Sequence, residues 1–278
     1  MSLRVLLTND DGIEAAGLQA LRRALREVDG VDLQVIAPDG NRSAVGRGIT
    51  ILRALTVRRV DFEDGSWGFA TDGTPVDCVR LSVLDLIPGW RPDVVVSGIN
   101  HGANLGDDVT YSGTVAAASE GLLLGVAGVA VSQEPLAGSL GVRHGQEFDF
   151  TVAAAFTARV VGELDDIPLP PATLLNINVP GRTPTGVEVA RLGRRVYRDQ
   201  LEPHADDDAA AAPHEPRRYF VYTAEPGFED EPGTDLNAVH AGRIAVTPLH
   251  LELTRHEGLA ALSEARLERL LTPVARER

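Results

Sequence analysis

The chain has 278 residues, 44% of them apolar, which is enough to bury one large core or one core with an appendage. Its formal net charge is −14 and it contains no lysine, so a binding surface for polymeric nucleic acid is not expected. No apolar run reaches the ~18 residues of a membrane-spanning helix, and the first residues lack a signal-peptide core, so we expect a cytoplasmic protein with no membrane partner.

Up to about Pro180, short apolar runs alternate with amphipathic segments. Strands are predicted at residues 5–7, 33–37, 93–96, 126–131 and 174–179. Helices are predicted at residues 16–28, 74–87, 112–124 and 148–164. This alternation is typical of a Rossmann-like α/β fold, a mostly parallel sheet with helices on both faces and right-handed crossovers.

The only cysteine, Cys78, lies in the first turns of the second predicted helix, which Thr74 caps and Pro75 begins. A single cysteine excludes an internal disulfide and a cysteine zinc cluster. No basic partner is apparent beside it in the sequence, so we expect an inert, buried thiol instead of a catalytic one.

The pattern changes after about Pro180. Strands are predicted at residues 187–192, 217–223 and 244–247, and an amphipathic tail helix at residues 258–271. Residues 201–216 are rich in Ala, Asp, Pro and His, which indicates an exposed loop and makes His204 and His214 poor candidates for metal ligands. We therefore predict a catalytic domain at residues 1–185 and a small β-rich extension with a tail helix at residues 186–278.

Two adjacent carboxylates, Asp10 and Asp11, directly follow the first predicted strand. Ligands of open α/β sheets bind at the carboxyl ends of the strands. Adjacent carboxylates repel each other unless a cation lies beside them, and their hard oxygens suit Mg²⁺ or Mn²⁺. The alternative is an Asx turn that begins the next helix, and the motif by itself does not separate the two.

Polar segments follow two further strands at the same predicted edge. After the second strand, Ser43 offers a neutral oxygen ligand and Asn41 or Arg42 can hold a phosphate, with a plain turn as the alternative. After the third strand, Asn100 offers a carbonyl oxygen of the kind that Mg²⁺ accepts. His101 is either a general acid or base or an exposed loop residue.

The helix predicted at residues 112–124 begins with Ser112, Gly113 and Thr114. Ser112 is a natural N-cap, and Gly113 leaves the first turn unobstructed. The free amides and the helix dipole can bind phosphate there, although a plain cap is the alternative. The sequence has no G-x-G-x-x-G run after the first strand and no P-loop or G-x-S-x-G signature.

Sequence runs along nearly the whole chain resemble the SurE family of survival-protein nucleotidases. They include LTNDDG at residues 7–12, NRS at 41–43, SGIN at 97–100, NLGDDV at 104–109 and YSGTVAAA at 111–118. Further matches are residues 37–39, 73–75, 176–180, 193–195, 197–199, 234–235 and 246–249. The resemblance implies a divalent-metal phosphatase that acts on nucleoside 5′- and 3′-monophosphates and, in some members, on short polyphosphate.

The resemblance also implies which residues form the site. It places one divalent ion per subunit, Mg²⁺ or Mn²⁺, on Asp10, Asp11, Ser43 and Asn100. Of these, Asp10, Asp11 and Asn100 are the predicted catalytic residues. The residues predicted to bind phosphate or substrate are Asn9, Asn41, Ser112, Gly113 and Thr114.

The remaining expectations concern the class of function, the nucleotide preference and the assembly. Two rival classes of function remain: a nucleotide-binding protein without turnover, and a metal-dependent glycosyl transferase or hydrolase. The family often has glycine and His or Asn where this chain has Ala44 and Arg47, so the nucleotide preference is undetermined. For assembly, the resemblance implies that residues from about Val187 onward reach a neighbouring subunit in a homodimer or homotetramer, with the active site inside each N-terminal domain.

Overall fold

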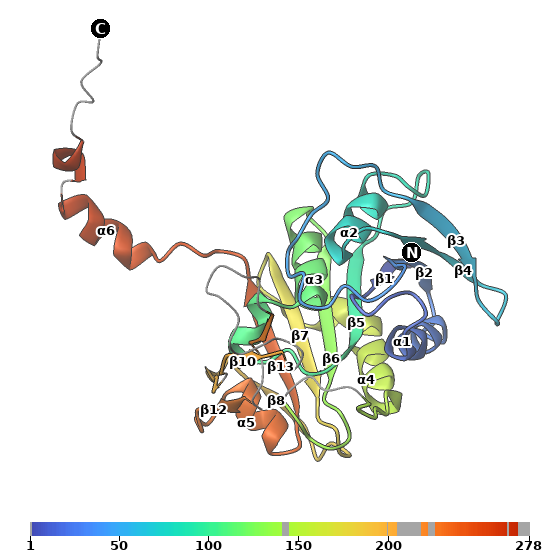
Figure 1. Ribbon diagram of the computed structural model, residues 1–278. Helices are drawn as coiled ribbons and strands as arrows, with labels where there is room; N and C mark the ends of the chain where they lie inside the picture. The colour runs from blue at the N-terminus through green and yellow to red at the C-terminus, as the bar shows by residue number, and fades with distance from the viewer. Residues whose placement is uncertain are drawn as a thin grey trace, which may run out of the picture.

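The structure, a computed structural model, describes residues 2–140, 145–198, 200–204, 218–221, 226–265 and 267–271. The strands of its central sheet are β1 (Leu3–Thr8), β2 (Val31–Pro38), β3 (Val57–Asp61), β4 (Trp67–Thr71), β5 (Val94–His101), β6 (Ala127–Gln133), β7 (Thr173–Val179), β8 (Val187–Val189) and β13 (Ile244–His250). In the described part of the chain they follow the order β3-β4-β2-β1-β5-β6-β7-β13-β8 (Figure 1).

The sheet is mostly parallel, which confirms the predicted fold class. Every neighbouring pair from β4 across to β7 is parallel. β3 and β13 run antiparallel to β4 and β7 respectively. From β1 in the middle, the chain proceeds first to β2 on one side and later to β5 on the other, so the carboxyl ends of β1 and β5 flank a topological switch point.

Helices cover both faces of the sheet (Figure 1). They are α1 (Ala16–Arg26), α2 (Pro75–Val83), α3 (Gly113–Leu123) and α4 (Thr151–Gly162). Alternate residues of a strand point to opposite faces, so Leu7 packs in one buried cluster with Leu21 of α1, while Leu6 packs with Cys78 of α2 and Ala117 of α3. Cys78 is buried, as predicted, and burial raises the pKa of its thiol.

Two strands that the sequence did not predict, β3 and β4, form one end of the sheet. β4 pairs with β2, and β3 is the outer strand. The arginines of β3, Arg58 and Arg59, are exposed, so this strand lacks the apolar run that identifies the inner strands. Arg22 of α1 covers the end of β3 by stacking on Phe62, 4.3 Å from the ring centroid.

After Pro180 the chain returns to the same sheet. β13 pairs with β7, and β8 pairs with β13. The expectation that all residues from about Val187 onward cross to another subunit is therefore wrong for these two strands. The division of the chain at residue 185 stays a prediction.

Short elements lie between β8 and β13. They are β9 (Arg195–Val196), β10 (Glu202–Pro203), β11 (Tyr219–Phe220), β12 (Gly227–Phe228) and α5 (Asp235–His240). β9 pairs with β12, and β10 with β11. β11 is the described part of the strand predicted at residues 217–223, while His214 and most of the predicted loop 201–216 lie outside the described residues.

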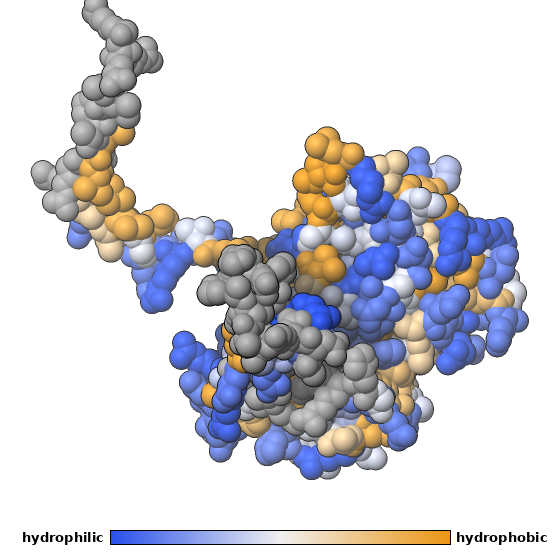
Figure 2. Space-filling view, in the orientation of Figure 1, coloured by the Kyte–Doolittle hydropathy of each residue, from blue (hydrophilic) through white to orange (hydrophobic). Residues whose placement is uncertain are grey.

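The described chain ends in an arm that leaves the body of the molecule (Figure 1). It contains α6 (His256–Glu264) and the short turn η3 (Leu267–Leu270), so the tail helix predicted at residues 258–271 is shorter than expected. Leu253, Leu259 and Leu262 are 89%, 52% and 56% exposed, and Figure 2 shows hydrophobic surface along this arm. No helix in the described ranges is long and apolar enough to cross a membrane.

Candidate active site

The turn that follows β1 is held by Asn9, whose side chain is fully buried. Its amide nitrogen donates to the Gly12 carbonyl (2.9 Å), and its amide oxygen accepts from the Gly12 N–H (3.2 Å). Gly12 has φ +108°, and a Cβ there would lie 3.1 Å from the Gly40 backbone. These contacts support a role of Asn9 in shaping the turn, and its contact with substrate stays a prediction.

Asp10 lies against the N-terminus of α3. Its carboxylate accepts from the Thr114 hydroxyl (2.6 Å) and from the Thr114 backbone. A Cβ at Gly113 would lie 2.8 Å from Asp10 Oδ2, so this close approach requires glycine. Ser112 caps the helix by accepting from the Val115 N–H (3.0 Å). The positive end of the α3 dipole therefore stabilises the Asp10 carboxylate itself.

Asp11 and His101 lie against each other at the ends of β1 and β5. The His101 N–H donates to Asp11 Oδ2 (3.1 Å), and His101 Nδ1 lies 3.7 Å from Asp11 Oδ1. The imidazole stacks on Phe148 and Phe150, with ring centroids 5.2 and 5.0 Å away, and its Nε2 accepts from the Gly17 N–H (3.4 Å). His101 is thus a packed residue, not a free loop residue, and burial lowers the pKa of its imidazole.

The carboxyl groups of Asp10 and Asp11 both have raised pKa values. The pKa of each is raised to about 6. Burial is the main cause, and the charge of Asp11 adds to it at Asp10. Buried like charges are costly unless a cation neutralises them, and carboxylate oxygens suit hard divalent ions. The pair therefore fits the predicted divalent cation.

The rest of a cation's ligands would have to be neutral oxygens. The described residues contain no group of three or more His, Cys, Asp or Glu side chains that could hold a metal ion. Asn100, at the end of β5, meets this need in part. Its amide nitrogen donates to the Gly102 carbonyl (2.7 Å), and its amide oxygen accepts no hydrogen bond within the described ranges.

The loop after β2 reaches the same edge of the sheet. The Arg42 N–H donates to the backbone carbonyl of Asp10 (2.6 Å). Next to it, Ser43 is exposed, and its N–H donates to Asn41 Oδ1 (2.7 Å). Ala44 has φ +62°, a backbone conformation that favours glycine.

The structure therefore gathers the predicted segments around the aspartates. Asp10 contacts Arg42 and Thr114, and Asp11 contacts His101. Asn9 and Asn41 each accept a backbone N–H of their own turn through the amide oxygen, and phosphate binding by either residue stays a prediction. The sequence did not reveal the pairing of Thr114 with Asp10, although glycine next to a helix cap is a signal of close approach.

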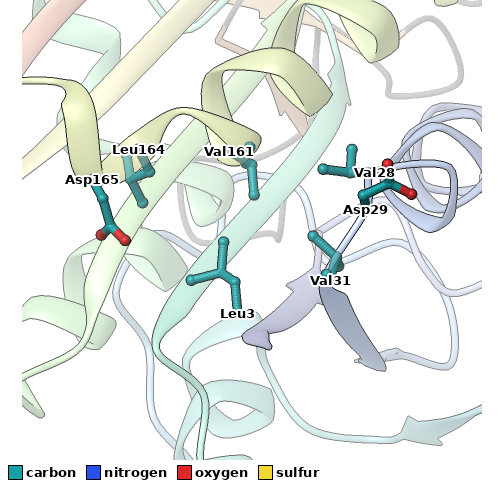
Figure 3. Close-up of a pocket in the computed structure, with 9 residues that line it drawn as sticks. Leu3, Val28, Asp29, Val31, Val161, Leu164 and Asp165 are labelled. Atoms are coloured by element: carbon teal, nitrogen blue, oxygen red, sulfur yellow. The ribbon is translucent and has the colours of Figure 1, made fainter. Parts of the chain in front are cut away.

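A separate hollow lies at the opposite edge of the sheet, where the strands begin. Its volume is about 190 Å³. Its lining residues are Leu3, Val28, Asp29, Gly30, Val31, Val161, Gly162, Leu164 and Asp165. Figure 3 shows Asp29 and Asp165 on opposite sides of this hollow, with apolar side chains between them. None of the predicted site residues lines it, so it is not part of the candidate active site.

Comparisons with known proteins relate the whole chain to one family. The family described as "Survival protein SurE" matches residues 5–199. The chain is 48% identical to 5′-nucleotidase SurE of Rubrobacter xylanophilus, covering 97% of this chain and 99% of that protein. It is 44% identical to 5′-nucleotidase SurE of Chloroflexus aggregans, covering 93% and 97%.

A solved structure agrees with these relatives. The crystal structure of SurE protein from Aquifex aeolicus has a TM-score of 0.76 and 35% identity, and the match covers 94% of this chain and 99% of that chain. The matched family spans more than half of the chain, and the sequence relatives match over nearly their full length. The chain therefore belongs to the SurE family.

Proposed function

We propose that this chain is a divalent-metal-dependent phosphatase that releases phosphate from nucleoside 5′-monophosphates and from 3′-monophosphates. The observation that carries the proposal is the pair of Asp10 and Asp11 beside the N-terminus of α3, with both side chains largely buried, because it joins a site for a cation to donors for an anion. The relatives' name, 5′-nucleotidase, supports the choice of nucleotide as substrate. Short polyphosphate is a further substrate that the same site can accept.

The proposed ligands of one Mg²⁺ or Mn²⁺ per subunit are Asp10, Asp11, Ser43 and Asn100, which all offer oxygen atoms. When bound, the ion supplies Lewis-acid stabilisation of charge on the phosphoryl group. The Gly113 N–H lies at the positive end of α3 and has no partner within the described ranges. It can donate to a phosphate oxygen and stabilise the charge that develops there.

Other residues of the site hold these groups in place. Thr114 fixes the Asp10 carboxylate, and His101 fixes Asp11 through its backbone N–H. Asn9 and Asn41 shape the turns that carry the aspartates and Ser43. We propose these as supporting roles, because each contact orients a group that the reaction uses.

The test is phosphate release from a panel of nucleoside 5′- and 3′-monophosphates and tripolyphosphate, each with Mg²⁺, Mn²⁺ or EDTA. We expect turnover with a metal ion and none with EDTA. Full activity in EDTA would contradict metal dependence. Nucleotide binding without phosphate release would favour a non-catalytic binding protein, and hydrolysis of glycosides but not of phosphate esters would favour a glycosyl hydrolase.

We also infer that the arm after β13 covers a second copy of this chain, in a homodimer or a pair of dimers. No residue of α6 is buried, and the helix has nine residues. A helix this short is marginal in water unless its apolar face is covered. An exchanged arm is a simple route to a two-fold oligomer.

Removing residues 252–278 should convert the oligomer to monomers without unfolding the sheet, because the cut leaves β13 in place beside β7. Light scattering at micromolar concentration measures the mass of the full and shortened chains, and circular dichroism checks the fold. Replacing Leu259 and Leu262 by Ser should weaken the oligomer in the same direction. A full-length chain that is monomeric would contradict the inference and leave the site proposal unaffected.

A further inference from the structure

A short 3₁₀ turn, η1 (Gly106–Thr110), comes just before α3, the helix whose first residues contact Asp10. Tyr111 and Ser112 follow η1 directly, so its position sets where α3 begins. Backbone bonds close η1 at its two ends: the Asp108 N–H donates to the Leu105 carbonyl (3.1 Å), and the Tyr111 N–H to the Asp108 carbonyl (3.0 Å). A single 3₁₀ turn has little stability of its own, so contacts from outside must fix it.

The first of these outside contacts is a buried arginine. Arg195, in β9, donates from Nε to Asp108 Oδ2 (2.6 Å), and its Nη2 contacts the same oxygen. The Arg195 N–H also donates to Asp107 Oδ2 (3.0 Å). The Arg195 side chain is 0% exposed, so its charge needs compensation, and Asp108 is the carboxylate in direct contact with the guanidinium. Both carboxylates of η1 are thereby tied to one residue of β9.

The second contact comes from Tyr197, whose hydroxyl donates to Asp108 Oδ1 (2.6 Å). Burial and this bond raise the pKa of the Tyr197 hydroxyl, which keeps it a donor. The two oxygens of Asp108 are therefore used by two different residues of the same segment. Such two-point binding restricts both the position and the rotation of the carboxylate.

The third contact is Asp235, at the start of α5. Its carboxylate accepts from the Gly106 N–H (2.8 Å), the Gly193 N–H (2.8 Å) and the Leu236 N–H (2.9 Å). Asp235 is fully buried, and a Cβ at Gly106 would lie 2.7 Å from the Gly193 carbonyl. The beginning of η1 and the segment before β9 are thus clamped together by one side chain.

We propose that Arg195 and Tyr197 are positioning residues of the active site, with Asp235 holding their segment against η1; this rests on the proposed function. They act through Asp108, which lies four positions before Ser112. A shift of η1 moves the start of α3, where Thr114 binds Asp10 and where Gly113 lies so close to Asp10 that a Cβ would be 2.8 Å from its Oδ2. The second half of the chain thereby sets the geometry of a site built by the first half.

The experiment compares Arg195→Met and Tyr197→Phe with the matched control Arg194→Met in the full-length protein. Arg194 is the neighbour of Arg195, but its side chain is 74% exposed and its Nη1 lies 3.9 Å from Glu229. Two quantities are measured well below the melting temperature: kcat for 5′-AMP with Mn²⁺, and the Kd for Mn²⁺ by calorimetry without substrate. Tyr197→Phe keeps the packing and removes only the hydroxyl, so it tests the proposal even if Arg195→Met fails to fold.

We expect Arg195→Met to lower kcat and weaken Mn²⁺ binding, each about tenfold, which is the size seen when supporting contacts of a metal site are removed. Tyr197→Phe should change both about threefold, and Arg194→Met should change neither. Adding Tyr197→Phe to Asp108→Ala should cost nothing more, because the bond is already lost.

Wild-type kcat and Mn²⁺ affinity in Tyr197→Phe and in folded Arg195→Met, with only the melting temperature lowered, would overturn the proposal and leave these residues a structural role. Full additivity of Tyr197→Phe with Asp108→Ala would also overturn it. A wild-type chain that binds Mn²⁺ but releases no phosphate would defeat the proposed function alone, because the Mn²⁺ affinities still decide whether these residues position the site.

Discussion

Replacing Asp11 by Asn should remove nearly all phosphatase activity and, at the same time, raise the melting temperature of the metal-free chain. Asn keeps the shape of the side chain and can still accept the His101 N–H. It removes one of two buried charges whose carboxyl pKa is raised to about 6. We expect activity to fall on the order of 10³-fold and the folded state to gain about 1 to 2 kcal/mol, or a few degrees.

The difference in melting temperature between wild type and Asp11→Asn should depend on pH. Below about pH 4 the carboxyls are protonated in the folded and the unfolded chain, so the penalty is absent. It grows as the pH rises and is complete above about pH 6, where the carboxyls ionise in the folded state as well. The melting temperatures of wild type and Asp11→Asn in EDTA should therefore diverge between about pH 4 and about pH 6 and stay apart above that range.

The matched control for this variant is Asp29→Asn, an exposed carboxylate where the strands begin. It should leave activity and melting temperature unchanged. Asp11→Asn with full activity, or with a lower melting temperature than wild type in EDTA at neutral pH, would contradict a cation site at the aspartates. Added Mn²⁺ should stabilise the wild type and Asp29→Asn but not Asp11→Asn.

The inner strands could be predicted because they are covered on both faces and therefore read as apolar runs. Leu6 and Leu7 are both fully buried although they point to opposite faces of the sheet. β3 could not be found in this way, since Arg58 and Arg59 are exposed on an outer strand. The return of β13 to the sheet was also missed, because no local pattern states which earlier strand a late strand will pair with.

The position of the site could be predicted from the sequence, but the side-chain contacts within it could not. The rule that ligands bind where parallel strands end correctly places Asp10 and Asp11 at one edge with the residues that follow β2 and β5. The bond between Thr114 and Asp10 joins residues 104 positions apart, and local patterns carry no information on such pairings. The aromatic support of His101 by Phe148 was hidden for the same reason.

Replacing Gly113 by Ala should disable the site through Asp10. From the sequence, a side chain at this position is expected only to obstruct a phosphate. The structure adds a second effect, because a Cβ there would lie 2.8 Å from Asp10 Oδ2 and 2.9 Å from Asp10 Cβ. Real Cβ atoms do not approach so closely, so α3 or Asp10 must move, and the bond from Thr114 (2.6 Å) is strained or lost.

We expect Gly113→Ala to lower kcat/KM on the order of 10² to 10³-fold, the loss seen when one donor to a developing negative charge is removed. Mn²⁺ binding should weaken as well, which a simple obstruction of phosphate would not cause. The matched control is Gly258→Ala, a helical glycine of α6 whose Cβ would meet no atom within 4 Å. Gly258→Ala should be silent or slightly stabilising. Unchanged kinetics and Mn²⁺ affinity in Gly113→Ala would show that α3 can yield, and would assign Ser112 and Gly113 to simple capping.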